Sequence, residues 1–231
     1  MQEPGDLPAD PRFLRIELRG EPVLLHPDRA LIWPARRTLL VADTHFGKDD
    51  TFRRAGIALP RGPAIADLQR LTALLEAHDC QRLVVLGDFV HSATVEGDAF
   101  LHAFALWRRA HASVSVEVVA GNHDRYEKTA KWDGMARWHR APLIEPPFVL
   151  AHEPVGREEG YVLAGHIHPV LRIAGRSERL RVPVFWQRSD YLVLPSFGSF
   201  TGGANIQPGE TDKVYAAGPE RVIPLSVRSF R

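Results

Sequence analysis

The chain has 231 residues, of which 45% are hydrophobic and 25% charged, and its formal net charge is +1. These values are typical of a globular protein with a sizeable core, and they exclude a largely disordered chain. Because the net charge is close to zero, a surface that attracts nucleic acid would have to be local. The single cysteine, Cys80, excludes an internal disulfide framework and fits a reducing compartment. It directly precedes an apolar strand, so we expect a buried, unreactive thiol.

The N-terminus has neither the basic start nor the apolar stretch of a signal peptide. No apolar run approaches the ~20 residues that a membrane-spanning helix needs. We therefore expect a cytoplasmic protein without membrane association. Residues 1–12 are rich in proline and poor in residues that a core could bury, which predicts a flexible tail. The remaining residues, 13–231, are expected to form one domain, because no linker or repeat interrupts them.

The first half of the chain reads as a run of strands followed by alternating helices and strands. A helix is predicted from Ile65 to about His78, where leucines recur at helical spacing. A second helix is predicted from Thr94, a suitable N-cap, to about His111. Strand–helix–strand–helix–strand order implies parallel pairing with right-handed crossovers. The strands predicted here are residues 13–18, 23–25, 30–33, 38–42, 82–86 and 114–120.

Beyond residue 125 the pattern changes to short strands separated by turns, with no clear long helix. This favours a second, more antiparallel sheet. The predicted fold is therefore α/β, with a two-sheet β-sandwich flanked by helices. The strands predicted in this part are residues 148–151, 161–164, 170–173, 182–186 and 191–194.

Five polar turns follow apolar runs and carry the residue types that bind metals. Strands that all end in such residues indicate a shared site. In Asp43-Thr44-His45 and in His166-Ile167-His168 the outer residues are two apart, so in an extended chain both side chains leave on the same side. The five turns are Asp43-Thr44-His45, Gly87-Asp88, Gly121-Asn122-His123-Asp124, Ala151-His152 and Gly165-His166-Ile167-His168.

The candidate ligands comprise two carboxylates, one amide and four imidazoles, without a thiolate: Asp43, Asp88, Asn122, His45, His152, His166 and His168. Mixed nitrogen and oxygen donors suit Mn²⁺, Fe or Zn²⁺. Seven groups are too many for one ion and enough for two, if one carboxylate is shared. Two such ions promote in-line displacement at phosphorus. His123 and Asp124 are left over; a histidine oriented by a carboxylate is suited to protonating the leaving oxygen.

The ordered set of these five motifs closely resembles the calcineurin-like metallophosphoesterase superfamily. The resemblance implies a four-layer fold, a metal-bearing β-sandwich flanked by helices. It also implies a histidine at His123 that acts on the substrate. One metal would be held by Asp43, His45, Asp88 and His168, and the other by Asp88, Asn122, His152 and His166.

A narrower resemblance points to the bacterial ligase-associated DNA damage response endonucleases. It is carried by residues 42–48, 52–57, 87–92, 152–154 and 195–203. It implies a Mn²⁺-dependent enzyme of DNA repair, associated with an ATP-dependent DNA ligase, a helicase and an exonuclease. Thr44 departs from the pattern, where an apolar residue is expected, but it should face away from the metals.

Several residues keep two interpretations. His91 either reaches the substrate or caps the turn that follows Asp88. Lys48, Arg53 and Arg54 either form a solvated surface or contact a phosphate backbone beside the site. For the whole protein, a DNA endonuclease is the first hypothesis. A phosphatase or phosphodiesterase for a small nucleotide-like metabolite, and a non-catalytic metal-stabilised interaction module, are the alternatives.

Overall fold

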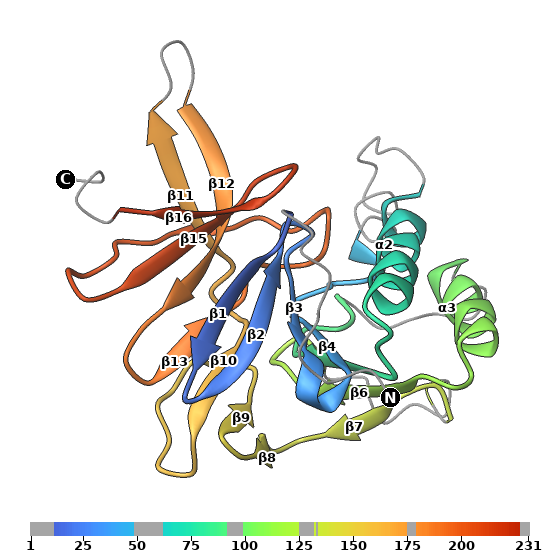
Figure 1. The fold of residues 1–231 in the computed structure, drawn as a ribbon. Helices are drawn as coiled ribbons and strands as arrows, with labels where there is room; N and C mark the ends of the chain where they lie inside the picture. Colours follow the sequence, from blue (N-terminus) through green and yellow to red (C-terminus); the bar gives the residue numbers. More distant parts are fainter. Residues whose placement is uncertain are drawn as a thin grey trace.

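Two β-sheets pack face to face, and two helices cover the outer side of the first sheet (Figure 1). The structure is a computed structural model, and it describes residues 12–48, 62–91, 99–124, 132, 134–174 and 179–226. The predicted tail at residues 1–11 and the predicted N-cap at Thr94 lie outside these ranges. No helix in the described ranges is long and apolar enough to cross a membrane.

The first sheet is mixed. Strands β1 to β4 pair antiparallel, whereas β4 to β7 pair in parallel. This confirms the predicted parallel arrangement of the strands that lead into the first three motifs. In spatial order the sheet contains β1 (Leu14–Leu18), β2 (Glu21–His26), β3 (Ala30–Trp33), β4 (Thr38–Val41), β5 (Arg82–Leu86), β6 (Ser115–Val119) and β7 (Arg137–His139). The helices described in full are η1 (Pro34–Arg36), α2 (Pro63–Ala77) and α3 (Ala99–Ala110).

The second sheet is also mixed, although a more antiparallel one was expected. Its hairpins are antiparallel, but β10 runs parallel to both of its neighbours, β9 and β13. The strands at residues 137–139 and 143–145, and those after residue 200, were not predicted from the sequence. The path contains β14 (Ala204–Asn205), β11 (Pro169–Ala174), β12 (Arg179–Gln187), β13 (Tyr191–Val193), β10 (Tyr161–Ala164), β9 (Phe148–Leu150) and β8 (Leu143–Glu145), and β12 also pairs β15 (Lys213–Ala217), which pairs β16 (Val222–Leu225).

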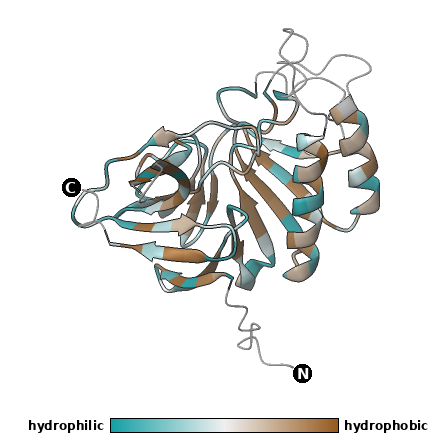
Figure 2. Ribbon diagram, turned by 90° about the horizontal axis from the view of Figure 1, so that it is seen from above, coloured by the Kyte–Doolittle hydropathy of each residue, from teal (hydrophilic) through white to brown (hydrophobic). Residues whose placement is uncertain are grey.

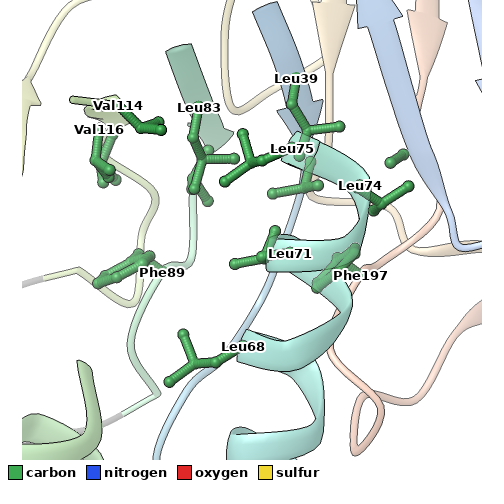
Figure 3. Close-up of a cluster of buried hydrophobic side chains, with 14 of the residues drawn as sticks. Leu39, Leu68, Leu71, Leu74, Leu75, Leu83, Phe89, Val114, Val116 and Phe197 are labelled. Atoms are coloured by element: carbon green, nitrogen blue, oxygen red, sulfur yellow. The ribbon is translucent and has the colours of Figure 1, made fainter. Parts of the chain in front are cut away.

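The central strands of the first sheet are buried on both faces, which explains their continuous apolar sequence. Leu39 of β4 points to the helices, whereas its neighbour Leu40 points to the second sheet. On the helix side, the leucines of α2 pack against β4 and β5 (Figure 3). Each fully buried leucine contributes about 1.5–3 kcal/mol to folding. Hydrophobic residues accordingly concentrate on the strands between the helices and the second sheet (Figure 2).

Candidate metal centre

The motifs meet where the two sheets join. Asp43, Asp88 and Asn122 follow β4, β5 and β6 of the first sheet, and His152 and His166 follow β9 and β10 of the second. The Asp43 amide donates to the Gly87 carbonyl at 3.1 Å, and the Gly165 amide donates to the His152 carbonyl at 3.0 Å. A bridge between Ala42 and Ser196 joins the sheets beside them. Five separate strand ends therefore deliver their side chains to one place.

Four of the side chains form a first group, with one ligand atom from each lying within 4.8 Å of the others: Asp43, His45, Asp88 and His168. Nε2 of His45 lies 3.4 Å from Nε2 of His168 and 3.6 Å from Oδ2 of Asp88. Nε2 of His168 lies 3.5 Å from Oδ1 of Asp43. Asp43, His45 and Asp88 are buried.

A second group adjoins the first through Asp88. Nε2 of His152 lies 3.0 Å from Oδ1 of Asn122 and 3.0 Å from Nδ1 of His166. It also lies 3.7 Å from Oδ1 of Asp88, the oxygen of that carboxylate that does not face His45. Asp88 therefore presents one oxygen to each group, an arrangement that suits a shared ligand.

The spacing of these atoms fits coordinated cations. Ligands about 2.1 Å from a metal are separated by about 3.0 Å at octahedral and about 3.4 Å at tetrahedral angles. The separations of 3.0–3.7 Å between the ligand atoms of the two groups span these values. In the described ranges, the ion pairs of the buried Asp43 and Asp88 are with histidines. Burying a carboxylate without a permanently charged cation beside it costs folding free energy, and a bound divalent ion would offset that cost.

The protonation state of His45 also suits metal binding. Burial lowers the pKa of His45 to about 2, and the neighbouring His168 adds to the effect. The His45 imidazole is therefore neutral near pH 7, and a neutral imidazole is the form that binds metal. Burial raises the pKa of Asp43, because the charged carboxylate is disfavoured in a dry site.

The backbone of the candidate ligands differs from expectation. Asp43, His45, Asp88, His166 and His168 all have positive φ, between 45° and 70°. The prediction that these two segments are extended is therefore wrong, although Asp43 and His45 still bring their side chains to one group as predicted. The left-handed turns at His166 and His168 place His168 in the first group and His166 in the second. Such conformations are unfavourable for residues other than glycine, and they concentrate at functional sites.

Two glycines make room for ligands from other strands. A Cβ atom on Gly87, which has φ +80°, would lie 1.9 Å from Nδ1 of His152. A Cβ atom on Gly165 would lie 2.5 Å from Oδ2 of Asp43. The glycine before Asp88 therefore admits the ring of His152.

The model of the family "Calcineurin-like phosphoesterase" matches residues 36–219, a range that contains every candidate ligand. The chain belongs to the calcineurin-like phosphoesterase family. The two mixed sheets with helices on the first are the α/β sandwich that the resemblance implied. No curated protein matches the chain significantly.

Among solved structures, Pseudomonas putida nuclease MPE shares 41% identity with this phosphoesterase, covers 93% of this chain and 100% of its own, and has a TM-score of 0.80. Aquifex aeolicus protein AQ665 shares 16% identity over 61% of this chain and 81% of its own, with a TM-score of 0.41. The E. coli phosphoesterase Yfce shares 14% identity over 84% of this chain and 94% of its own, with a TM-score of 0.40. The last two are remote likenesses.

The structure of this phosphoesterase places two further histidines, His123 and His91, beside the two groups of candidate ligands. His123 is exposed, and its ring centre lies 5.4 Å from that of His45. Its backbone amide donates to Oδ1 of Asp88 at 3.0 Å. The ring of His91 stacks on that of His123, with centres 5.7 Å apart. Nδ1 of His91 is buried without a hydrogen-bond partner in the structure. Burial lowers the pKa of His91. This position favours the interpretation in which His91 reaches the substrate over the one in which it caps the turn after Asp88.

Asp124 occupies a different place from the one predicted. Its carboxylate accepts backbone N–H bonds from Gly121 at 2.9 Å, Phe89 at 3.2 Å and Val90 at 3.1 Å. It is 1% exposed, and burial raises its pKa to about 6. Both oxygens therefore brace the turns around Asp88 and Asn122, whereas the sequence suggested that they orient the His123 ring. Asp124 is accordingly a positioning residue of these turns.

The candidate substrate-binding cations are only partly described. Lys48 is half-buried, and its amide donates to the His45 carbonyl at 3.2 Å. Burial lowers its pKa, while the nearby Asp88 opposes the effect. Arg53 and Arg54 lie outside the described residues. Thr44 faces away from the metal groups as expected, and its hydroxyl donates to the Phe89 carbonyl at 2.9 Å.

Asp67 and Ser196 contribute to the site but were not singled out from the sequence. The Ser196 hydroxyl donates to the Asp43 carbonyl at 2.8 Å. Asp67 lies on α2 at helical spacing with the buried Leu71 and Leu74, and is itself 3% exposed. An acidic residue inside an otherwise apolar helical stripe was the signal that marked it.

Proposed function

We propose that this phosphoesterase is a metal-dependent phosphodiesterase that cleaves DNA, with two divalent cations, preferably Mn²⁺. The observation that carries the proposal is the Asp88 carboxylate, which presents one oxygen to each of two adjoining ligand groups. Two cations held there would lower the pKa of water and neutralise the charge on a phosphate. The likeness to the P. putida nuclease over the length of both chains supports a nucleic acid as the substrate, and the narrower sequence resemblance favours DNA.

The exposure of the site agrees with a large substrate. Asp43, His45 and Asp88 are buried, whereas Asn122, His123 and His166 are exposed. The second ligand group therefore opens to solvent through Asn122 and His166, and the first through the partly exposed His168, so a phosphodiester can approach from this side.

In this arrangement His123 binds the phosphate that lies over the ligand groups and protonates the departing oxygen. His91, stacked on His123, holds that ring in place. Lys48, Arg53 and Arg54 bind flanking phosphates. We further propose a role in DNA repair beside an ATP-dependent ligase, a helicase and an exonuclease, on the basis of the narrower sequence resemblance.

The test is cleavage by chelator-treated protein after Mn²⁺, Mg²⁺ or Zn²⁺ is added back. The substrates are a supercoiled plasmid and bis-p-nitrophenyl phosphate, and bound metal is counted by elemental analysis. We expect two ions per chain and cleavage of both substrates with Mn²⁺. Asp88→Ala should bind fewer ions and lose at least about 100-fold in rate, since both groups lose a ligand.

The matched control is Asp79→Asn, which alters an exposed carboxylate that pairs with Arg37 away from the site. It should behave as the wild type. Hydrolysis of the small ester with the plasmid intact would reassign the substrate to a small metabolite. Metal binding without any hydrolysis would support an interaction module instead. Full activity in Asp88→Ala would contradict the shared ligand.

A further inference from the structure

Asp67 is a buried carboxylate outside the metal groups, on the face of α2 that packs against the first sheet. Its Oδ2 accepts the backbone N–H of Ser199 at 2.9 Å, and its Oδ1 accepts the Ser199 hydroxyl. Nη1 of Arg70, one helical turn along α2, donates to Oδ1 at 2.7 Å. Both carboxylate oxygens are therefore used to hold one residue of a distant segment.

Arg70 holds the same segment from a second direction. Its Nη1 donates to the Phe197 carbonyl at 3.2 Å, and its guanidinium lies 4.0 Å from the centre of the Phe197 ring. Its Nη2 donates to the Asp28 carbonyl at 2.7 Å. Phe197 is fully buried and packs beside the α2 leucines (Figure 3). Residues 197–199 are thus anchored to α2 by polar and apolar contacts together.

The anchored segment in turn holds Asp43. The Ser196 hydroxyl and the Gly198 amide donate to the Asp43 carbonyl at 2.8 and 3.4 Å. The Phe197 amide donates to the Ala42 carbonyl at 2.8 Å. Asp43 has φ +52°, a conformation that a non-glycine residue keeps only where its surroundings impose it. A continuous path of contacts therefore runs from Asp67 to the backbone of a candidate metal ligand.

We propose that Asp67 is a positioning residue for the metal centre, which acts through Ser199 and residues 196–198 on Asp43. The inference rests on the part of the proposed function that assigns Asp43 to a metal. Outer residues that orient ligands typically change metal affinity 10- to 100-fold when they are replaced. A residue that only stabilised the fold would change the melting temperature and leave metal affinity unaltered.

The test measures Mn²⁺ binding directly, by titrating metal-free full-length protein and following free Mn²⁺ by electron paramagnetic resonance. Asp67→Asn keeps the size of the side chain but presents N–H groups where Ser199 or Arg70 donates. We expect at least about 10-fold weaker binding of one Mn²⁺ ion. Ser199→Ala removes only the hydroxyl bond, and about threefold weaker binding is expected. Asp79→Asn, an exposed carboxylate remote from residues 196–199, should bind Mn²⁺ as the wild type does.

Melting temperature in chelator is recorded for every variant. The inference would be overturned if both Ser199→Ala and Asp67→Asn bound Mn²⁺ with wild-type affinity. A lowered melting temperature of Asp67→Asn, without any change in its Mn²⁺ affinity, would count as the same result. If Asp67→Asn does not fold, Ser199→Ala decides the matter. The Mn²⁺ titration contains no substrate. If the protein failed to cleave DNA in the separate activity assay, the proposed function would be overturned, but the measured effect of Asp67 on Mn²⁺ affinity would stand.

Discussion

Nε2 of His152 faces Oδ1 of Asn122 at 3.0 Å, while Nδ1 of the same ring lies 3.2 Å from the Leu86 carbonyl. Both oxygens only accept hydrogen bonds, and a neutral imidazole has one proton to donate. A metal ion held by Asn122 and His152 would bind the lone pair of Nε2, which leaves the proton on Nδ1 for the Leu86 carbonyl. An imidazole held in this way by a main-chain carbonyl is the usual arrangement of a metal-binding histidine. The carbonyl that would hold this tautomer of His152 belongs to β5, a strand of the other sheet.

Replacing Gly87 by alanine should disrupt this arrangement. The new Cβ atom would lie 1.9 Å from Nδ1 of His152, so the ring must move away from Leu86 and Asn122. We expect Gly87→Ala to weaken metal binding at least about 10-fold, as measured by Mn²⁺ titration.

Gly20→Ala is the matched control for the backbone. Gly20 has φ +83°, against +80° for Gly87, and no atom lies within 4 Å of the position of its Cβ. Both substitutions strain the backbone by about 1 kcal/mol. Only Gly87→Ala should lose metal, and equal losses in the two variants would contradict the steric explanation.

His123→Ala should retain metal and lose phosphodiesterase rate. The His123 ring touches the edge of the ligand set, and its loss removes a proton donor worth about 10²- to 10⁴-fold. The loss should be large on DNA and small on bis-p-nitrophenyl phosphate, because p-nitrophenolate leaves without a proton. Rate constants at saturating Mn²⁺ measure the contrast.

The exposed His102 on α3 provides the comparison, since His102→Ala removes an imidazole away from the described ligand groups. Its rates should equal those of the wild type on both substrates. Equal losses for His123→Ala on DNA and on the p-nitrophenyl ester would contradict a role in protonating the leaving oxygen.

Cys80 should be unreactive in the folded protein. Burial raises the pKa of its thiol to about 12, from a value of 9.0 in the unfolded chain. The folded state therefore holds this proton more tightly, so the contribution of Cys80 to stability is present below pH 9 and falls as pH rises from 9 towards 12. At pH 8 a disulfide reagent such as dithionitrobenzoate should react slowly with native protein and rapidly with protein unfolded in guanidinium. Rapid reaction of the native protein would contradict the buried position.

The sequence predicted the secondary structure of the central sheet well, because apolar runs and helical leucine spacing depend on local pattern. Residues 30–33 and 82–86 form the strands expected, and α2 ends where His78 was expected to end it. β15 and β16 were missed. β16 carries Pro224, and a proline is compatible with a strand only where its missing N–H is not needed. The identity of the candidate ligands also came from local sequence, because each lies in a polar turn after an apolar run.

The family resemblance implied how those ligands divide, whereas only the tertiary structure shows the backbone geometry behind that division and the contacts that support it. His166 and His168 separate into two groups because of positive backbone angles, which no alternation rule contains. The carboxylate of Asp124 binds the turns of Asp88 and Asn122, although sequence adjacency suggested His123 as its partner. Asp67 reaches Ser199 over an interval of 132 residues. The sequence by itself determined which chemical groups the site contains, since those are fixed by residue type. Their geometry depended on contacts between segments far apart in the chain, which only the packing of the two sheets and α2 brings about.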